Sequence, residues 1–219
     1  MPASDGTVLT IGHSTHAMEA FVELLQRHDV TAVADVRASP YSRFNPQFNR
    51  ESLAGSLVAC GITYVFLGSE LGGRSDDPSC YENGRISYAR LGGTPSFQNG
   101  LDRVAQGATS QRIALMCAEK EPLECHRGLL VAPALEVRGV SVAHVGPEGG
   151  LEPHADAMRR LIALHGMGDA IEEQRLFPRS HAERVAEAMN RQAHRFAHRK
   201  EAPTDDSTHP RRRNRELQT

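Results

Sequence analysis

Residues 8–28 read VLTIGHSTHAMEAFVELLQRH and join two kinds of hydrophobic pattern. Val8–Ile11 is a short apolar run typical of a buried strand, and it stops at a polar turn, residues 12–15. After the turn, apolar residues and one histidine recur at the spacing of a helical face: Ala17, Phe21, Leu24, Leu25 and His28. The stretch therefore predicts a strand, a turn and a helix.

The same alternation continues along the chain. It predicts strands at residues 31–36, 62–67, 112–117 and 140–145, and helices at residues 51–60, 96–106 and 126–138. Pro133 falls inside the last helix, where it should kink the helix or lie in a distorted turn. Residues 68–94 form a glycine-rich polar segment longer than an ordinary connection, which favours a functional or mobile loop. Strands alternating with helices predict an α/β fold, a three-layer open, mostly parallel sheet of about five strands with helices on both faces.

Length and pattern also predict the domain organisation. A chain of 219 residues favours one domain. We expect residues 1–200 to form a single α/β domain, with a C-terminal helical extension over about 151–200. Residues 201–219, which contain Arg211-Arg212-Arg213 and few apolar residues, are predicted to be a disordered Arg-rich tail.

Composition excludes several classes of protein. Hydrophobic residues make up 39% and charged residues 24%, which excludes a wholly disordered chain, and no apolar run approaches the roughly 18 residues of a membrane span. Four cysteines are too few for a disulfide framework and no secretion signal is evident, so we expect a cytoplasmic protein with reduced thiols. Net charge is −2, so the surface as a whole does not indicate a nucleic-acid partner.

Arginine dominates the basic residues. Only Lys120 and Lys200 among the 25 basic residues are lysines. This argues against Schiff-base chemistry and leaves bidentate recognition of phosphate or carboxylate available. A GC-rich genome would produce the same bias.

Open α/β sheets bind ligands beyond the carboxyl ends of their strands. After the first predicted strand, Gly12, His13 and Ser14 lead into a helix N-terminus, which suits an anion or equally a plain helix cap. After the second, Asp35 and Arg37 lie on one side of the extended chain and either pair with each other or point together into a cleft.

Two loops carry further candidates. Arg43 lies among Tyr41, Phe44 and Phe48, a combination that suits base stacking beside a charged backbone, or that simply docks the loop on the core. Arg74 follows Gly72-Gly73, a pair that permits close backbone approach or forms a flexible turn.

The fourth predicted strand leads to the strongest cluster. Cys117 ends it, Glu119 follows, and Cys125-His126-Arg127 opens the next helix. Three chemistries fit: covalent thiol catalysis, a Cys/Cys/His metal site, and a dithiol switch. The spacing is not that of the Cys-x5-Arg loop of cysteine phosphatases. The loop lacks a close Cys-x2-Cys pair and a clear fourth ligand, so no metal ligand and no cofactor are assigned. Small buried cysteines at a tight junction, with Arg127 holding a loop, explain the cluster equally well.

Several of these motifs, in this order, resemble the family called domain of unknown function 488. They are Ile11-Gly12-His13-Ser14-Thr15, Asp35-Val36-Arg37 with Pro40 and Ser42-Arg43, Leu71-Gly72-Gly73, and Cys117-x-Glu119 with Cys125-His126-Arg127. Glu152-Pro153-His154 and the helix around Gln192 extend the resemblance to about residues 7–200. It implies a compact α/β domain and no established activity.

The favoured hypothesis is an enzyme acting on a phosphate-bearing ligand, a nucleotide or nucleic acid. Cys117, Cys125, His126, Asp35 and Glu119 are its candidate catalytic residues. Its candidate ligand-binding residues are Gly12, His13, Ser14, Arg37, Arg43, Arg74 and Arg127. The alternative is a metal-binding or thiol-redox regulatory module without catalysis, and a purely structural network remains a third explanation. No membrane partner is expected, and the oligomeric state is left open.

Overall fold

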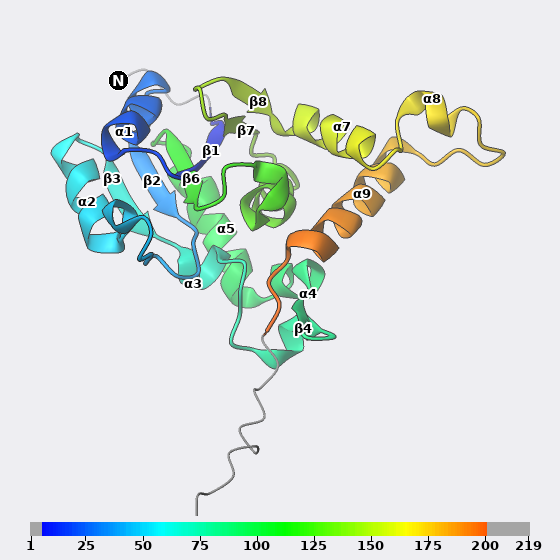
Figure 1. Cartoon of the computed structure of the whole chain (residues 1–219), viewed down its shortest axis with the longest axis horizontal. Coiled ribbons are helices and arrows are strands. Elements are labelled where there is room, and N and C mark those ends of the chain that lie inside the picture. The colour runs from blue at the N-terminus through cyan, green and yellow to red at the C-terminus, as the bar shows by residue number, and fades with distance from the viewer. Residues whose placement is uncertain (1–5, 201–219) are drawn as a thin grey trace, which may run out of the picture.

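The apolar runs predicted as strands form the centre of the protein. The computed structural model describes residues 6–200, and its main sheet has six strands in the order β3-β2-β6-β1-β7-β8 (Figure 1). The strands are β1 (Val8–Gly12), β2 (Ala32–Asp35), β3 (Thr63–Phe66), β6 (Ile113–Cys117), β7 (Val142–Val145) and β8 (Leu151–Pro153). All neighbours are parallel except β7 and β8. The expected three-layer, mostly parallel α/β fold is confirmed.

Period-two alternation along the strands builds a core on each face of the sheet. Leu9, Val33 and Met116 pack on one face against α1 (Met18–Arg27) and α2 (Arg50–Ala59). Val8, Ala34 and Leu115 point to the other face, which α5 (Pro95–Gly107) and α6 (Ala132–Glu136) cover. The central strands are buried on both faces, as parallel strands require.

One strand of the main sheet was not predicted. A tight turn reverses the chain after β7, where Gly146 N donates to Gly150 O at 2.8 Å and Gly149 has a φ of +87°. This reversal brings β8 antiparallel to β7 at the sheet edge. Residues 151–153 are only three long and not fully buried, so no apolar run marks them.

Pro133 is accommodated without breaking the polypeptide's helical path. Arg127–Val131 forms a π-helical turn, and Pro133 then lies in the first turn of α6. A proline at this position removes no hydrogen bond of α6 itself, because the N–H groups in the first turn of a helix have no partner within that helix. The predicted helix over residues 126–138 is therefore two short helical segments.

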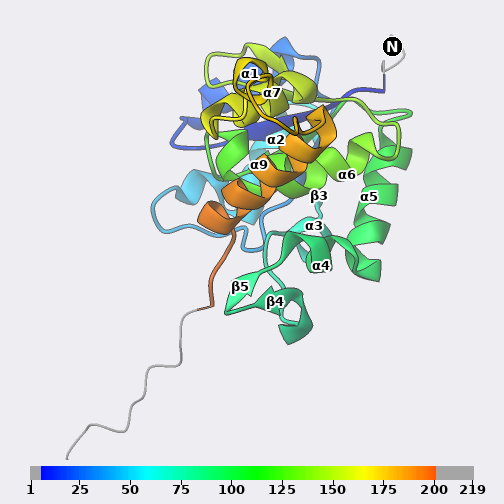
Figure 2. The same ribbon diagram turned by 90° about the vertical axis from the view of Figure 1, so that its right-hand side faces the viewer.

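Residues 68–94, predicted as one loop, contain small elements instead. They are α3 (Gly68–Leu71), a 3-10 turn (Pro78–Cys80), β4 (Tyr81–Glu82), β5 (Arg85–Ile86) and α4 (Tyr88–Gly92) (Figure 2). Asn83 and Gly84 both have positive φ and form the hairpin turn between β4 and β5. Asn-Gly is the strongest short signal for such a hairpin, and it was present in the sequence.

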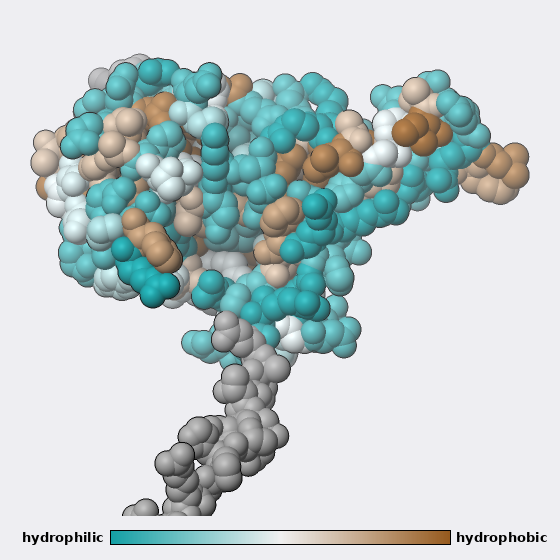
Figure 3. Space-filling model, viewed as in Figure 1, coloured by the Kyte–Doolittle hydropathy of each residue, from teal (hydrophilic) through white to brown (hydrophobic). Residues whose placement is uncertain are grey.

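The C-terminal helices extend away from the sheet and then return. They are α7 (His154–Leu164), α8 (Asp169–Glu172) and α9 (His181–Phe196), and α9 begins with a capping box between Ser180 and Glu183. Leu161 and Ala188 pack α7 and α9 together beneath the π-helical turn. Leu176 and Phe177, in the segment between α8 and α9, are exposed, and Figure 3 shows hydrophobic surface at the far end of this arm.

Two observations bear on the remaining expectations. None of the helices within residues 6–200 has the length and apolar character that crossing a membrane demands. The Arg-rich tail predicted for residues 201–219 lies outside the described residues.

Two buried histidines link the sheet to α7. Thr10 Oγ1 lies 2.8 Å from His144 Nδ1, and His144 Nε2 lies 3.0 Å from His154 Nδ1. Burial, with the neighbouring His154, lowers the pKa of His144 to about 3, and burial lowers that of His154 to about 4. Both imidazoles are therefore neutral at pH 7.

These pKa values predict acid sensitivity. An unfolded histidine titrates near 6.5, so below that pH the unfolded chain binds more protons than the folded chain. The free energy of unfolding should be greatest above pH 6.5 and fall toward pH 4, each histidine contributing up to about 1.4 kcal/mol per pH unit. Urea denaturation at a series of pH values measures this slope.

A matched pair of variants isolates the cause. The double variant His144→Gln/His154→Gln removes both titrating groups and should have a shallower slope. His181→Gln, at an exposed position, should keep the wild-type slope. Equal slopes in the two variants would contradict the assignment.

Candidate functional site

The strand order places three polar segments side by side. Because β6 lies between β1 and β2, the residues that follow these strands meet at one sheet edge. His13 N donates to Cys117 O at 2.9 Å, and Val36 N donates to Met116 O at 3.0 Å. Segments separated by about a hundred residues are thereby fixed to each other at main-chain level.

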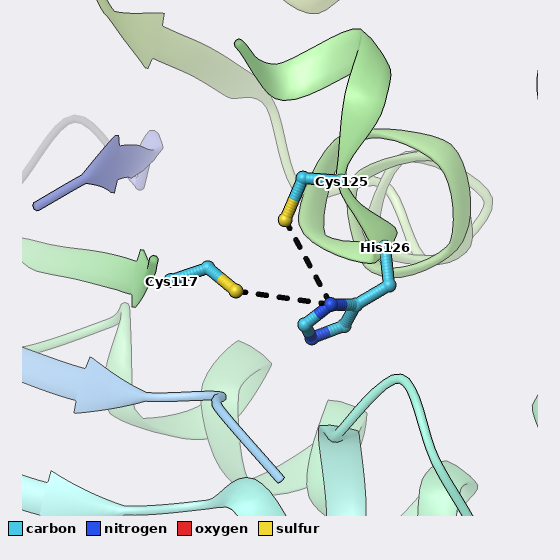
Figure 4. A group of neighbouring side chains, drawn as sticks. All are labelled: Cys117, Cys125 and His126. Atoms are coloured by element: carbon cyan, nitrogen blue, oxygen red, sulfur yellow. Dashed lines mark hydrogen bonds between the residues drawn. The ribbon is translucent and has the colours of Figure 1, made fainter. Parts of the chain in front are cut away.

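Two thiols, an imidazole and a carboxyl group converge after β6. The Sγ atoms of Cys117 and Cys125 lie 3.8 Å and 3.7 Å from His126 Nδ1 (Figure 4). The same two sulfurs lie 2.9 Å and 3.1 Å from Glu119 Oε2. Both cysteines are free and buried, while Glu119 is exposed over much of its surface and turns Oε2 inward. These four side chains therefore form one cluster.

The His126 ring is held in one orientation. Nε2 lies 3.0 Å from the carbonyl oxygen of Val36, which only accepts, so Nε2 carries a proton and donates. Nδ1 is thereby directed at the sulfurs. Gly73 packs against the ring so closely that an added Cβ would lie 2.9 Å from His126 Cγ. Close backbone approach, one of the two explanations for Gly72-Gly73, applies at Gly73.

The two thiols have opposite pKa shifts. Their mutual hydrogen bond, burial and the nearby negative charges raise the pKa of Cys117 well above its usual value. Burial opposes ionisation of Cys125 too, but the bond with Cys117, Arg127 and His126 together lower the pKa of Cys125 well below its usual value. Burial would lower the pKa of His126, yet the charge of Cys125 raises it. The surroundings thus favour ionisation of Cys125 over ionisation of Cys117.

The carboxyl group of Glu119 contacts both thiols and has a shifted pKa. Burial of its inward end and the charge of Cys125 raise the pKa of Glu119 above its usual value. A raised carboxyl pKa is a common property of groups that exchange protons in catalysis.

Arg127 builds the loop that carries the cluster. Its side chain is fully buried, and Nη1 and Nη2 donate to the carbonyls of Glu119 and Lys120 at 2.7 Å and 3.0 Å. Its backbone N–H donates to Cys125 Sγ at 3.5 Å. The side chain lines neither of the pockets described below, so the structure gives Arg127 a supporting part in place of ligand contact.

Gly12 serves the same loop. A Cβ at this position would lie 1.9 Å from the carbonyl oxygen of Glu119. The sequence suggested a ligand-binding part for Gly12, and its observed part is to let the 119–120 backbone pass close over β1.

Asp35 and Arg37 form a buried ion pair. Arg37 Nε and Nη2 donate to the two carboxylate oxygens at 2.9 Å and 2.6 Å, and Nη2 also donates to Phe48 O at 2.8 Å. Tyr64 donates its hydroxyl proton to Asp35 at 2.9 Å. Both oxygens of Asp35 are therefore engaged, which suits a residue that positions Arg37 better than a general base.

His13 lies beside this pair. Nδ1 donates to Ser14 O at 2.9 Å, so Nε2 can accept from Arg37 Nη1 at 3.3 Å. The ring stacks on Phe48 with centroids 4.3 Å apart. Burial lowers the pKa of His13 to about 4, which keeps the ring neutral at pH 7.

Two pockets open over the sheet edge. The first, about 260 Å³, is lined by the cluster residues Cys117, Glu119, Cys125 and His126 together with Arg74, Tyr88 and Phe196, among others. The second, about 330 Å³, is lined by His13, Ser14, Tyr41, Ser42 and Lys120, among others. Both pockets are lined by Arg37, Ser39, Ala118 and Glu119, so they adjoin.

The remaining arginine candidates differ in position. Arg74 is exposed on the rim of the first pocket and makes no hydrogen bond or ion pair with the described part of the chain. Arg43 is exposed over Phe44, 4.7 Å from the ring centre, and lines neither pocket. Phe48 docks its loop on the core, whereas Tyr41 and Phe44 are exposed.

Some residues of the site were not predicted. Tyr64, Tyr88, Ser39, Phe196 and His198 lie at the ion pair or around the first pocket. The return of the chain after α9 brings Phe196 and His198 there, through the bond from Ile86 N to His198 O at 2.9 Å. No local pattern signals a contact between segments so distant in sequence.

The close approach at Gly12 predicts a large effect of one methyl group. Gly12→Ala should lower the free energy of unfolding by about 1–3 kcal/mol, because the added Cβ overlaps backbone that Arg127 holds in place. Gly55→Ala is the control: Gly55 lies in α2 with open space around it, and the change should raise stability by about 0.5–1 kcal/mol. Denaturant unfolding measures both. A Gly12→Ala protein as stable as wild type would show that the loop is not tightly held.

Comparison with known proteins gives one match. No curated protein and no solved structure matches significantly. A family model described as "Domain of unknown function DUF488" matches residues 17–133, which is more than half of the chain and includes Asp35, Arg37 and the whole Cys117–Arg127 segment. His13, Glu152-Pro153-His154 and Gln192, where the resemblance was expected to extend, lie outside the match. The chain belongs to the DUF488 family.

Proposed function

We propose that this protein is an enzyme acting on a phosphate-bearing ligand, a nucleotide or a nucleic acid, bound over the carboxyl ends of β1, β2 and β6. Its reactive centre is the cluster of Cys117, Glu119, Cys125 and His126, hereafter the thiol cluster. The observation that carries the proposal is the adjoining pair of pockets, whose linings include the thiol cluster and the cationic side chains of Arg37, Arg74 and Lys120.

Three cationic side chains line the two pockets. Arg37 lines both pockets, Lys120 lines the second and Arg74 lines the first. Asp35 and Phe48 O hold the Arg37 guanidinium by Nε and Nη2, while Nη1 has only the longer contact with His13. A fixed guanidinium edge of this kind suits a phosphate oxygen.

The thiol cluster supplies groups for proton transfer and for bond formation. Glu119, with its raised pKa, is the best placed acid or base, because it lines both pockets and contacts both sulfurs. In this proposal Asp35 positions Arg37, and Gly12 and Arg127 hold the loop. Arg43 contributes only to a ligand long enough to extend beyond the pockets.

Binding tests the ligand class. Arg74→Ala and Lys120→Ala should each weaken binding of nucleotides or short oligonucleotides about tenfold at low salt, because each removes one cation from the rim, and a loss of about 1.4 kcal/mol corresponds to tenfold. Arg159→Ala, an exposed arginine on α7 outside both pockets, is the control for net charge. Titration calorimetry or fluorescence anisotropy measures the affinities. Absence of binding, or equal weakening by Arg159→Ala, would overturn the ligand class.

Turnover tests the reactive centre separately. Mass spectrometry of nucleotide mixtures incubated with the protein should reveal conversion of one component. Glu119→Gln should abolish the conversion while keeping ligand affinity within a few-fold, because the change removes a proton acceptor and little volume. Conversion that persists in Glu119→Gln would contradict the proposed centre.

A second candidate is a metal-binding or thiol-redox regulatory module without catalysis. It is supported by the two free thiols, whose sulfur atoms lie within 4.8 Å of each other. It differs from the first candidate in two predictions. Metal binding or oxidation of the thiols should not depend on a nucleotide, and no nucleotide should be converted.

A further inference from the structure

We propose that Cys117, Cys125 and His126 bind one zinc ion, and that its fourth position is open to water beside Glu119. The inference goes beyond the proposed function by naming a cofactor, and only its catalytic consequence rests on that function. The sequence allowed a Cys/Cys/His metal site, but it assigned no ligands because the loop lacks Cys-x2-Cys spacing and a clear fourth ligand.

The distances fit a zinc tetrahedron. Zinc–sulfur bonds of about 2.3 Å and zinc–nitrogen bonds of about 2.0–2.1 Å place a sulfur and a nitrogen ligand about 3.6 Å apart. The observed separations from His126 Nδ1 are 3.8 Å to Cys117 Sγ and 3.7 Å to Cys125 Sγ. All three ligand atoms lie within 4.8 Å of one another (Figure 4). A zinc ion needs only small side-chain adjustments to bind all three.

The surroundings orient the ligands. Metal-binding histidines usually donate their other ring N–H to a carbonyl or carboxylate, and His126 Nε2 does so to Val36 O at 3.0 Å. Gly73 leaves just enough room for the ring. The backbone N–H of Arg127 donates to Cys125 Sγ, a contact that suits a thiolate ligand. The site therefore has a supporting layer as well as three donors.

The donor set matches the charge of the ion. Two thiolates neutralise a zinc ion, and a neutral His126 that binds through Nδ1 adds no charge. Glu119, whose Oε2 contacts both sulfurs, is a further acidic group beside the three ligands.

Three protein ligands leave one position free, as in catalytic zinc sites. The pocket of about 260 Å³ is lined by all three ligands and by Glu119, so the free position faces a ligand-sized space. Zinc held there would supply a Lewis acid for a bound water. Glu119 lies where it could accept the proton of that water as the water oxygen bonded to the electrophilic atom of the ligand, and could return the proton to the leaving group as its bond broke. The reaction would be a hydrolysis that consumes one water.

Zinc content is the direct test. Reduced full-length protein should contain, or bind on titration, one zinc per chain, and cobalt in its place should give thiolate-to-metal charge-transfer bands. Cys117→Ser and Cys125→Ser should weaken zinc binding by more than the roughly 10- to 100-fold typical of losing a supporting residue. Cys60→Ser, at an exposed cysteine in the cap of α2, should bind as wild type.

Glu119→Gln tests the open position. It should keep one zinc per chain at an affinity within a few-fold of wild type, which also provides a folded variant if the cysteine variants do not fold. A large loss of zinc in Glu119→Gln would show a closed four-ligand site and overturn the open position. Wild-type protein that binds neither zinc nor cobalt would overturn the metal site itself.

The two proposals fail in different ways. Zinc and cobalt binding are measured without any nucleotide, and the effects of Arg74→Ala and Lys120→Ala on nucleotide affinity are measured without reference to the metal. Zinc binding without nucleotide binding leaves the metal site standing and removes the ligand class. Nucleotide conversion by protein that cannot bind zinc leaves the ligand class standing and removes the metal site.

Discussion

The buried guanidinium of Arg127 is the interaction on which the candidate site depends. It bridges the carbonyls of Glu119 and Lys120, near the start of the loop that joins β6 to the π-helical turn. Hydrogen bonds from a charged donor contribute about 1.5–3 kcal/mol each, and the fully buried side chain would be costly to leave without them. The start of the loop is consequently tied to Arg127 just beyond its end, and Cys117, Glu119 and Cys125 keep their relative positions.

Glycines make this arrangement sterically feasible. Gly12 lets the Glu119 carbonyl pass over β1, Gly128 lies against the carbonyl of Pro122, and Gly73 leaves space for the His126 ring. In each case an added Cβ would lie closer than 3.0 Å to its neighbour. None of the three has positive φ, so close packing and not backbone conformation explains them. The thiol cluster is therefore a small, rigid constellation at the edge of a sheet buried on both faces.

Local pattern was sufficient for the regular elements and insufficient for the contacts of charged side chains. Apolar runs predicted β1, β2, β3, β6 and β7, because the pattern that marks a strand lies in residues that are neighbours in the sequence. β8 was missed since its pairing depends on a turn at Gly149. Arg37 and Arg127 were both predicted to contact a ligand. Arg127 donates its hydrogen bonds to main-chain carbonyls. Every residue has such a carbonyl, so the sequence does not indicate which of them an arginine will contact.

The sequence by itself determined the alternation of strands and helices, and hence the edge of the sheet at which polar residues gather. It also placed Cys117, Glu119, Cys125 and His126 near one another, because a short loop cannot carry them far apart. Only the tertiary structure decided which atoms face each other. The direction of His126 Nδ1 follows from a hydrogen bond to Val36, 90 residues away, and the engagement of Asp35 follows from Tyr64 on β3. Such contacts depend on how β2, β3 and β6 pair in space, which no local stretch of sequence encodes.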